Sequence, residues 1–573
     1  MKAARVLIRA LVLPALFAAP STAWAQADDH SPNMRLVGHF DDGGAYKQGS
    51  DEAFWGTKAI VGTYGSPGGM RVIDISNPAA PFQIGKLDCP GSQADVSVWK
   101  DLVFMSVDSA REDDKCGTGE ASETTAASGS AWEGIRIVSI RDPAHPTQIA
   151  TVRTACGSHT NTLVPDLGHD RILLYVLSYP LGAPNPSCNQ AQHSKISVVE
   201  VPLSNPAAAK VIATPSVAPT IGCHDVTVFL ERKLAGAGCI TESQIWDISD
   251  PVHPRILSHI YNPLINIHHS SGFSWDGKTM VLGDELGGAE FTPGCLGPQQ
   301  APIGALWFYD VSDPTAPALK GSFRVPQQHA SVQCTAHDFD VVPLPSGKDI
   351  LVSAWYEGGT TLVDFTDPAN PTQLAYYVKA GTNYWSSYWY NGHVYGNAFV
   401  PGGLDVFDVS APEVGGASTL DHLNTSTQEL FPGPPPTGGR IVGKGKHCVD
   451  GARPRSRVDK RKTRFTRGGV ALRGTSSDAG CGKARAGKVA RVRVAVALLT
   501  GKRCRFLRAA GGFGQATSCG SQRYLRARGK TKWSFSRRAS FPAGRYRAWV
   551  RATDARGNLE RRSATNTVSF RIP

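Results

Sequence analysis

The sequence predicts an all-β fold: a seven-bladed β-propeller followed by a small β-sandwich. Three observations predict it. One short motif returns seven times, its spacing is that of a four-stranded unit, and the charge changes sign after a proline-rich segment. We predict an export signal at 1–25, the propeller at 26–412, a Pro/Gly-rich linker at 413–447 and the basic sandwich at 448–573.

The repeated motif is an apolar strand ending in an acid or its substitute, then Ser or Thr, then Asp or Asn before a proline. VIDISNP, IWDISDP, FYDVSDP and LVDFTDP are its clearest copies. An Asp or Asn side chain can cap its own turn, and proline cannot continue a β-ladder. Each copy therefore predicts a strand, a stop and a turn, at Pro78, Pro143, Pro206, Pro251, Pro314, Pro368 and Pro412.

The spacing of the motif predicts one blade per copy. The motif prolines are 65, 63, 45, 63, 54 and 44 residues apart, a span that fits a four-stranded β-unit, whereas a solenoid helix pair is usually shorter. MRLVGHF at 34–40 is similar to the last strand of a unit but has no motif before it. We expect it to pair into the seventh blade and close the ring, which leaves no free sheet edge.

The motif resembles that of the LVIVD-repeat proteins over roughly residues 34–412. This resemblance implies an exported or cell-surface bacterial β-propeller, a family whose biochemical activity is generally unassigned. Two copies depart from the pattern: VPLSNP carries an extra proline, and Ala411 replaces the acid in the seventh copy. Fold is a safer inference here than function, because one fold hosts many functions.

The N-terminus has the pattern of an export signal. Lys2, Arg5 and Arg9 precede the apolar run ALVLPALFAA and the small-x-small site at 23–25. That run is too short to span a membrane, and we expect no transmembrane segment elsewhere. An exported chain with 12 cysteines predicts disulfides. We predict Cys223 with Cys239, Cys504 with Cys519 and, more loosely, Cys448 with Cys481.

Charge divides the chain into an acidic body and a basic tail. Residues 26–439 carry 22 basic against 43 acidic side chains, and residues 440–573 carry 35 against 5. Outside the cell, a basic surface suits anionic wall polymer, acidic lipid or another polyanion, and export disfavours nucleic acid. Two alternatives stay open. The basic side chains could serve only to solvate the tail, or they could dock the tail on the acidic body.

The tail is strand-rich, with VARVRVAVALL and GRYRAWVRATDARGN among its strand-like stretches and short turns between them. This pattern predicts a small β-sandwich. The stretch 546–558 resembles the penultimate strand of bacterial immunoglobulin-like or fibronectin-like modules, which implies an Ig/fibronectin-like sandwich.

A histidine column marks the candidate site. When the motif prolines are aligned, the innermost strands of four blades begin with a histidine in the same position: His159, His224, His269 and His337. These strands line the channel of a propeller, so the four side chains should meet at one mouth. Imidazoles are good ligands for Zn, Cu or Fe. The column is also similar to the histidine-lined mouth of the selenium-binding protein and methanethiol oxidase propellers, which are metal-dependent, and this similarity implies a redox metal.

Neighbouring acids could complete such a site. We name Glu285 and Glu357 as catalytic candidates, and His268 and Asp284 as further metal candidates. Strand alternation predicts that Asp225 and Asp338 face away from the histidines. Cys156, Cys223 and Cys334 could bind a soft metal as thiolates, although disulfides are commoner outside the cell. The alternative to a metal site is structural: the histidine could recur because it caps the same turn in each blade.

Several standard chemistries have no motif in this sequence: the phosphate-binding glycine-rich loop, the nucleophile elbow and the HExxH zinc helix are all absent. The sequence favours an exported binding or scaffold protein that meets an unknown protein or small molecule at the propeller mouth. The alternative is an exported metal-dependent oxidoreductase or hydrolase with a histidine-lined site. Partner, substrate and oligomeric state stay open.

Overall fold

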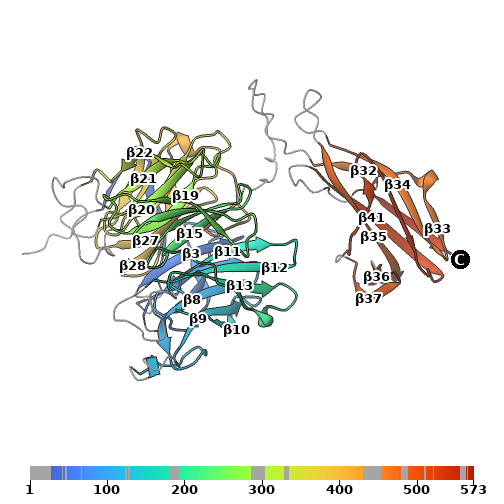
Figure 1. Cartoon of the computed structure of the whole chain (residues 1–573), viewed down its shortest axis with the longest axis horizontal. Helices are drawn as coiled ribbons and strands as arrows, with labels where there is room; N and C mark the ends of the chain where they lie inside the picture. Colours follow the sequence, from blue (N-terminus) through green and yellow to red (C-terminus); the bar gives the residue numbers. More distant parts are fainter. Residues whose placement is uncertain are drawn as a thin grey trace, which may run out of the picture. The chain divides into compact units, whose positions relative to one another are not determined.

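The computed structural model describes residues 28–573 except 42, 45–47, 66, 123–124, 127–129, 180–192, 286–303, 328–333, 430–452, 479–487, 502, 509–510, 520–521, 555–559, 561–562 and 564. The export signal expected at 1–25 and the Cys448–Cys481 pair lie outside these residues. The chain forms two compact units, 1–431 and 432–573 (Figure 1). No helix in the described part is long and apolar enough to cross a membrane.

The first unit is built of antiparallel sheets whose strands follow one another in sequence. The first three sheets contain β3 (Gly49–Trp55), β4 (Lys58–Thr63), β5 (Gly69–Asp74) and β6 (Phe82–Asp88); β7 (Val96–Trp99), β8 (Leu102–Arg111), β9 (Trp132–Ser139) and β10 (Thr147–Arg153); and β11 (Thr160–Asp166), β12 (Arg171–Leu177), β13 (Ser197–Pro202) and β14 (Lys210–Ala213). The extra proline of the third motif copy, Pro202, ends β13 and leaves its sheet complete.

Four further sheets follow in the described part of this unit. They contain β15 (Asp225–Phe229), β16 (Leu234–Gly238), β17 (Ser243–Asp247) and β18 (Arg255–Ile260); β19 (His268–Phe273), β20 (Thr279–Asp284), β21 (Leu306–Asp310) and β22 (Ala318–Phe323); β23 (Phe339–Val341), β24 (Ile350–Ala354), β25 (Thr360–Asp364) and β26 (Thr372–Val378), with β1 (Asp29–His30) on β26; and β27 (Asn383–Tyr390), β28 (His393–Val400) and β29 (Leu404–Val409), joined by β2 (Met34–Phe40). Two 3₁₀ turns, at Pro206–Ala208 and Pro412–Val414, also lie in this unit, and a third, at Lys460–Lys462, lies in the second unit.

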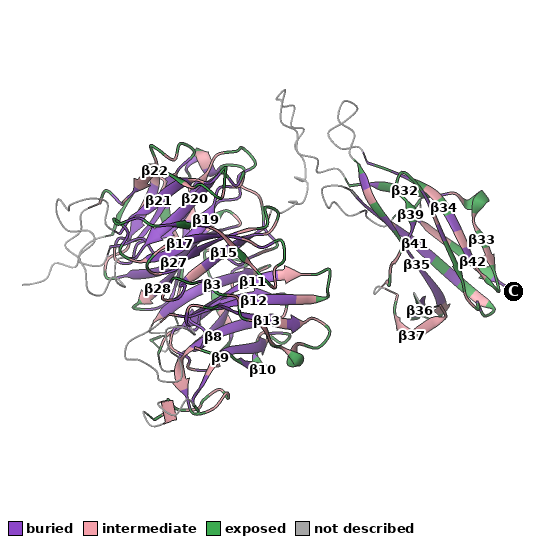
Figure 2. Cartoon of the chain, in the orientation of Figure 1, coloured by how far each residue is buried: buried purple, intermediate pink, exposed green. Residues whose placement is uncertain are grey.

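The sheets are arranged around a common axis as a β-propeller. Their first strands contact one another in a closed circle, in the order β3, β7, β11, β15, β19, β23, β27 and back to β3. β2 pairs antiparallel with β29, so the predicted pairing of residues 34–40 is confirmed. Apolar clusters fill the space between adjacent sheets, and buried residues follow the strands while exposed residues gather in the turns (Figure 2).

The Asp before the motif proline caps its turn, as predicted. Its carboxylate accepts a bond from the backbone N–H two residues later, from Ala144 to Asp142 at 3.2 Å, from Val252 to Asp250 at 3.0 Å, from Thr315 to Asp313 at 2.9 Å and from Ala369 to Asp367 at 3.1 Å. The acid that ends the strand makes the same kind of bond, as from Ser76 to Asp74 at 2.8 Å. The motif proline also joins neighbouring sheets: the carbonyls of Pro251 and Pro314 accept bonds from Tyr175 and Ser258, each at 2.7 Å. The motif therefore fixes both the turn within a sheet and the contact to the preceding one.

Residues 415–429, which we call the strap, extend the first unit beyond the expected boundary at 412. Within the strap, β30 (His422–Leu423) pairs with β3 and β31 (Thr427–Gln428) pairs in parallel with β15. The Asn424 amide bonds both main-chain groups of Val98, at 2.7 and 3.0 Å, and the Gln428 amide does the same to Phe273, at 2.7 and 2.8 Å. Residues 415–429 of the linker expected at 413–447 therefore belong to the first unit. These amides satisfy main-chain groups at the open inner edges of first strands, a role that composition alone does not reveal.

The second unit contains two antiparallel sheets that share one apolar core. One sheet has β32 (Arg455–Val458), β33 (Arg464–Thr466), β34 (Gly469–Ser477), β39 (Arg528–Gly529) and β40 (Lys532–Arg538). The other has β35 (Val489–Thr500), β36 (Arg503–Leu507), β37 (Phe513–Ser518), β38 (Leu525–Arg526), β41 (Gly544–Asp554) and β42 (Thr567–Ile572). Leu472 and Phe535 of the first sheet meet Val494 and Ala548 of the second in the core.

Candidate metal centre

The four histidines of the column come together where the first strands β11, β15, β19 and β23 begin. All four are buried. The Nε2 atoms of His159 and His224 lie 2.9 Å apart, the rings of His224 and His269 have centroids 3.7 Å apart, and those of His269 and His337 are 4.5 Å apart. The predicted convergence of these side chains is therefore present, whereas metal binding stays a prediction.

Hydrogen bonds at Nδ1 fix the tautomers of three rings. Nδ1 of His159 lies 2.6 Å from Asp108, and Nδ1 of His224 lies 2.9 Å from Asp225. Nδ1 of His337 lies 2.6 Å from the Trp385 carbonyl, and because a carbonyl can only accept, this nitrogen must carry the proton. In the neutral rings, the Nε2 atoms of these three histidines therefore carry lone pairs.

Burial favours the neutral form of three of the rings. Burial is the largest cause that lowers the pKa of His224, His269 and His337, and neighbouring imidazoles lower the first two further. Burial also raises the pKa of Asp225 to about 6. A neutral imidazole is the form that ligates a metal.

The lone pairs lack partners of their own. The Nε2 atoms of His159 and His224 face each other, and two lone pairs at that separation repel unless a cation or proton lies between them. Nε2 of His337 and both nitrogens of His269 are buried with no hydrogen-bond partner among the described residues. The nearest carboxylate oxygens to His269, on Asp225 and Glu285, are 3.6 and 3.7 Å away. The donor set therefore fits a transition metal.

Glu285 lies at this centre, directly after β20. Ligand atoms of His224, His269 and Glu285 lie within 4.8 Å of one another, as do those of His269, His337 and Asp338. The Tyr356 hydroxyl donates to Glu285 at 2.6 Å, and burial followed by this carboxylate raises the pKa of the phenol well above its usual range. Glu285 is thus held by Tyr356 and can serve as a ligand or accept a proton.

The other predicted site residues have different surroundings. His268 bonds the Ser243 hydroxyl at 2.8 Å, and burial lowers its pKa to about 4. Asp284 accepts backbone N–H bonds from Asn266, Ile267 and Gly304 at 3.0–3.1 Å. His268, Asp284 and Glu357 belong to neither of the two groups of potential ligands in the described part of the chain. His159 is also outside both groups, and its link to the centre is the 2.9 Å contact with Nε2 of His224.

The expectation that Asp225 and Asp338 face away from the histidines is wrong. Asp225 bonds His224, and Asp338 has an oxygen 3.3 Å from Nδ1 of His337. Strand alternation fails because His224, His337 and Asp338 precede the regular strands β15 and β23. Both acids also line a polar cavity of about 20 Å³ in the channel, which Thr425 and Ser426 of the strap line as well.

Sequence reasoning missed Asp108, Tyr64, Tyr179 and Tyr356. Tyr179 lies against His159 with ring centroids 4.9 Å apart, and Tyr356 and Trp385 lie 4.8 and 4.3 Å from His337. Asp108 lies near the end of β8, and Tyr64 directly follows β4. Tyr179 and Tyr356 each lie one residue further from the ends of β12 and β24. All four therefore mark the ends of second strands. Aligning those ends, where Glu285 also lies, would have found them.

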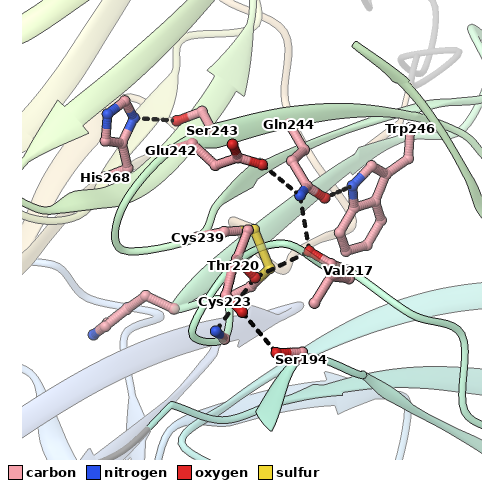
Figure 3. Close-up of a disulfide and its surroundings, with 12 residues drawn as sticks. Ser194, Val217, Thr220, Cys223, Cys239, Glu242, Ser243, Gln244, Trp246 and His268 are labelled. Atoms are coloured by element: carbon pink, nitrogen blue, oxygen red, sulfur yellow. Dashed lines mark hydrogen bonds between the residues drawn. A yellow bond between two sulfur atoms is a disulfide. The ribbon is translucent and has the colours of Figure 1, made fainter. Parts of the chain in front are cut away.

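A disulfide holds the start of β15 in place. Cys223, the residue before His224, is bonded to Cys239, as predicted (Figure 3). Beside it, the Gln244 side chain donates to the Val217 carbonyl at 2.9 Å and accepts from Trp246 at 2.8 Å. Cys156 and Cys334 are also disulfide-bonded, so the thiolate alternative is wrong for all three cysteines. The Cys504–Cys519 pair is confirmed, and Cys89–Cys116 is a further disulfide.

With this fold and site, the chain is a β-propeller protein that carries LVIVD repeats. The model of the LVIVD repeat matches residues 66–88 and 304–325, which contain the first and fifth motif copies. No curated protein matches the chain.

Solved structures with low similarity include a putative 6-phosphogluconolactonase from Bacteroides fragilis, with 11% identity, TM-score 0.38 and coverage of 66% of this chain and 89% of that chain. Another is a putative 6-phosphogluconolactonase from Bacteroides uniformis, with 12% identity, TM-score 0.35 and coverage of 65% and 89%. A protein from Lactobacillus plantarum has 12% identity, TM-score 0.38 and coverage of 56% and 82%. At these TM-scores we base neither fold nor activity on them.

Proposed function

We propose that this chain is an exported, seven-bladed β-propeller enzyme that uses one transition metal at the mouth of its channel. His159, His224, His269 and His337 hold the metal, with Glu285 as an additional ligand or base. The observation that carries this proposal is the facing pair of Nε2 lone pairs on His159 and His224, in a buried site with two more imidazoles beside it. The closed circle of seven sheets in the described residues supports the blade number.

A zinc, copper or iron ion in such a site supplies either Lewis acidity or electron transfer. The chain itself orients the imidazoles through Asp108, Asp225 and the Trp385 carbonyl. Glu285, fixed by Tyr356, is placed to take a proton from a bound molecule. These residues suit oxidation or hydrolysis of a small molecule that binds beside the imidazoles, where the rings of Tyr179, Tyr356 and Trp385 also lie.

Metal analysis of the purified full chain tests this proposal. We expect stoichiometric zinc, copper or iron, which a His224→Ala/His337→Ala double variant loses. The matched control is His268→Ala, which removes an equally buried imidazole bonded to Ser243. A wild-type protein that stays metal-free after incubation with each ion and shows no thermal shift would reject the metal centre.

A second role, attachment to anionic envelope material, is favoured by the charge of the second unit. Residues 440–573 carry 35 basic and 5 acidic side chains, and such a surface attracts polyanions. In this role the propeller is a binding or scaffold element held at the cell surface. Disulfides in both units suit an oxidising, extracellular compartment. Retention of the full chain on isolated cell wall should fall as salt is raised, and salt-insensitive retention would reject the role.

We also propose that the second unit is an Ig/fibronectin-like sandwich. Its two sheets share one core, and the Tyr546 hydroxyl donates to the Pro542 carbonyl at 2.6 Å, near the start of β41. A tyrosine that bonds the backbone a few residues upstream is the tyrosine corner of Ig-like domains.

A further inference from the structure

The outer face of the β32–β34–β40 sheet carries cations in successive rows. Because paired residues of neighbouring strands share a face, the register defines these rows. Arg457, Thr475 and Lys532 form the first row, and Arg473, Ser534 and Arg528 the second. Arg464, Ala471 and Ser536 form the third, and Thr466, Gly469 and Arg538 the fourth. Every row therefore holds at least one exposed cation.

This face is hollowed along the strands. One groove, of about 920 Å³, is lined by the side chains of the first two rows, and a second, of about 590 Å³, by those of the last two. Ser534 lies in the middle of the second row, between Arg473 and Arg528, and Ala471 lies in the middle of the third row. We call the two grooves together the trough; small residues and long basic residues both line it.

The charge of the trough is not neutralised by the described residues. None of its six row cations, Arg457, Arg464, Arg473, Arg528, Lys532 and Arg538, has an ion pair among the described residues. Asp459 is the one acid lining either groove, and it lies 3.9 Å from Lys462. Six like charges on one open face repel one another, and an anionic ligand would relieve this repulsion.

The other sheet of the same unit differs. Its outer face is covered near β36 by an apolar cluster of Ala495, Ala497, Phe506 and Trp549. Arg491 and Arg545 are exposed on that sheet, yet no groove described in this unit includes them. Basic composition is thus common to both sheets, and the two grooves described among these residues are lined by the β32–β34–β40 sheet.

We propose that the trough binds a linear polyanion with one anionic group per repeat unit, lying along the strands. Rows on one face of a strand recur every second residue, about 7 Å apart. A polymer with anionic groups at about that spacing meets one row per group, and the arginine guanidinium groups suit phosphate or carboxylate oxygens. This inference rests on the attachment role proposed above and assigns it to one face.

The test measures binding of the full chain to two soluble polymers, poly(glycerol phosphate) and polygalacturonate, by titration calorimetry at several salt concentrations. The Arg473→Ser/Arg528→Ser variant removes both cations of the second row. The matched control is Arg491→Ser/Arg545→Ser, which makes the same charge change on exposed positions of the other sheet. Circular dichroism confirms that each variant is folded.

We expect the trough variant to lose about tenfold in affinity, with a weaker salt dependence, and the control to lose less than twofold. The tighter polymer identifies phosphate or carboxylate as the preferred anion. Equal losses in both variants would overturn the trough and leave the attachment role standing. Binding to neither polymer would overturn the trough. If phosphatidylglycerol vesicles then bind the chain, the attachment role stands through acidic lipid; if they do not bind, the attachment role is rejected as well.

Discussion

The Nε2 atoms of His159 and His224 lie 2.9 Å apart, while the other nitrogen of each ring is held by a different aspartate. The two aspartates come from different places: Asp108 from the second strand of one sheet and Asp225 from the residue after His224. Together they turn two lone pairs toward one point, which is what a metal ligand set requires.

Asp108→Asn should weaken metal binding by about 10- to 100-fold, because an asparagine can orient the His159 ring wrongly and makes it less basic. Competition with a chromogenic chelator measures this affinity. Asp142→Asn is the control, since Asp142 bonds the exposed His145 on a turn. Unchanged affinity in the Asp108 variant would mean that His159 is not a ligand.

Removing the Cys223–Cys239 disulfide with Cys223→Ser/Cys239→Ser should lower the free energy of unfolding by about 3 kcal/mol. It should also weaken metal binding, because the bond fixes the residue next to His224. Thermal denaturation and chelator competition give the two readouts. Cys504→Ser/Cys519→Ser removes a disulfide of similar loop length from the other unit and should leave metal affinity as it was.

Gln428→Ala should destabilise the propeller by about 2–3 kcal/mol, since it leaves the buried N–H and C=O of Phe273 unpaired. Urea denaturation followed by tryptophan fluorescence measures the loss. Asn370→Ala removes an exposed amide bonded to Asp367 and should cost less than about 0.5 kcal/mol. Equal costs for both variants would argue against a structural role for the strap.

The closure of the ring should depend weakly on pH through His39. The bond to Asp405 on β29 is the largest cause that raises the pKa of His39 above 6.5. The folded state therefore binds the His39 proton more tightly than the unfolded state does. The resulting stabilisation of the folded state is fully present below the ordinary pKa of histidine and is lost as pH rises through the raised pKa of His39.

His39→Gln should accordingly lower the free energy of unfolding by about 0.5 kcal/mol at pH 5.5, a value reduced for the exposure of the side chain, and by almost nothing at pH 9. Urea denaturation at both pH values gives the comparison. His30→Gln, whose Nδ1 lies 3.1 Å from the main-chain oxygen of Ser31, should show no such difference. A loss for His39→Gln that is the same at both pH values would contradict the ionic contribution.

Much of the first unit was predictable because its information is local and repeated. The turn at the Asp or Asn before the proline and the stop at the proline follow from residue chemistry that the copies repeat. The closing strand at 34–40 was recognised by its similarity to the last strand of a unit. The convergence of His159, His224, His269 and His337 followed from aligning those copies. Asp225 was misjudged because alternation was extended to a residue next to a strand end. Asp108 was missed because the ends of the second strands were not aligned in the same way. The strap depends on contacts between distant segments, which no local pattern reports.

The strap lies across one end of the propeller channel. The histidines lie where the first strands begin, and the strap binds Val98, Val228 and Phe273 toward the ends of theirs. Side chains from both Thr425 and Ser426 face the small cavity between. Among the described residues the strap therefore covers that end of the channel. We predict that a small molecule reaches and leaves the imidazoles at the end where the first strands begin.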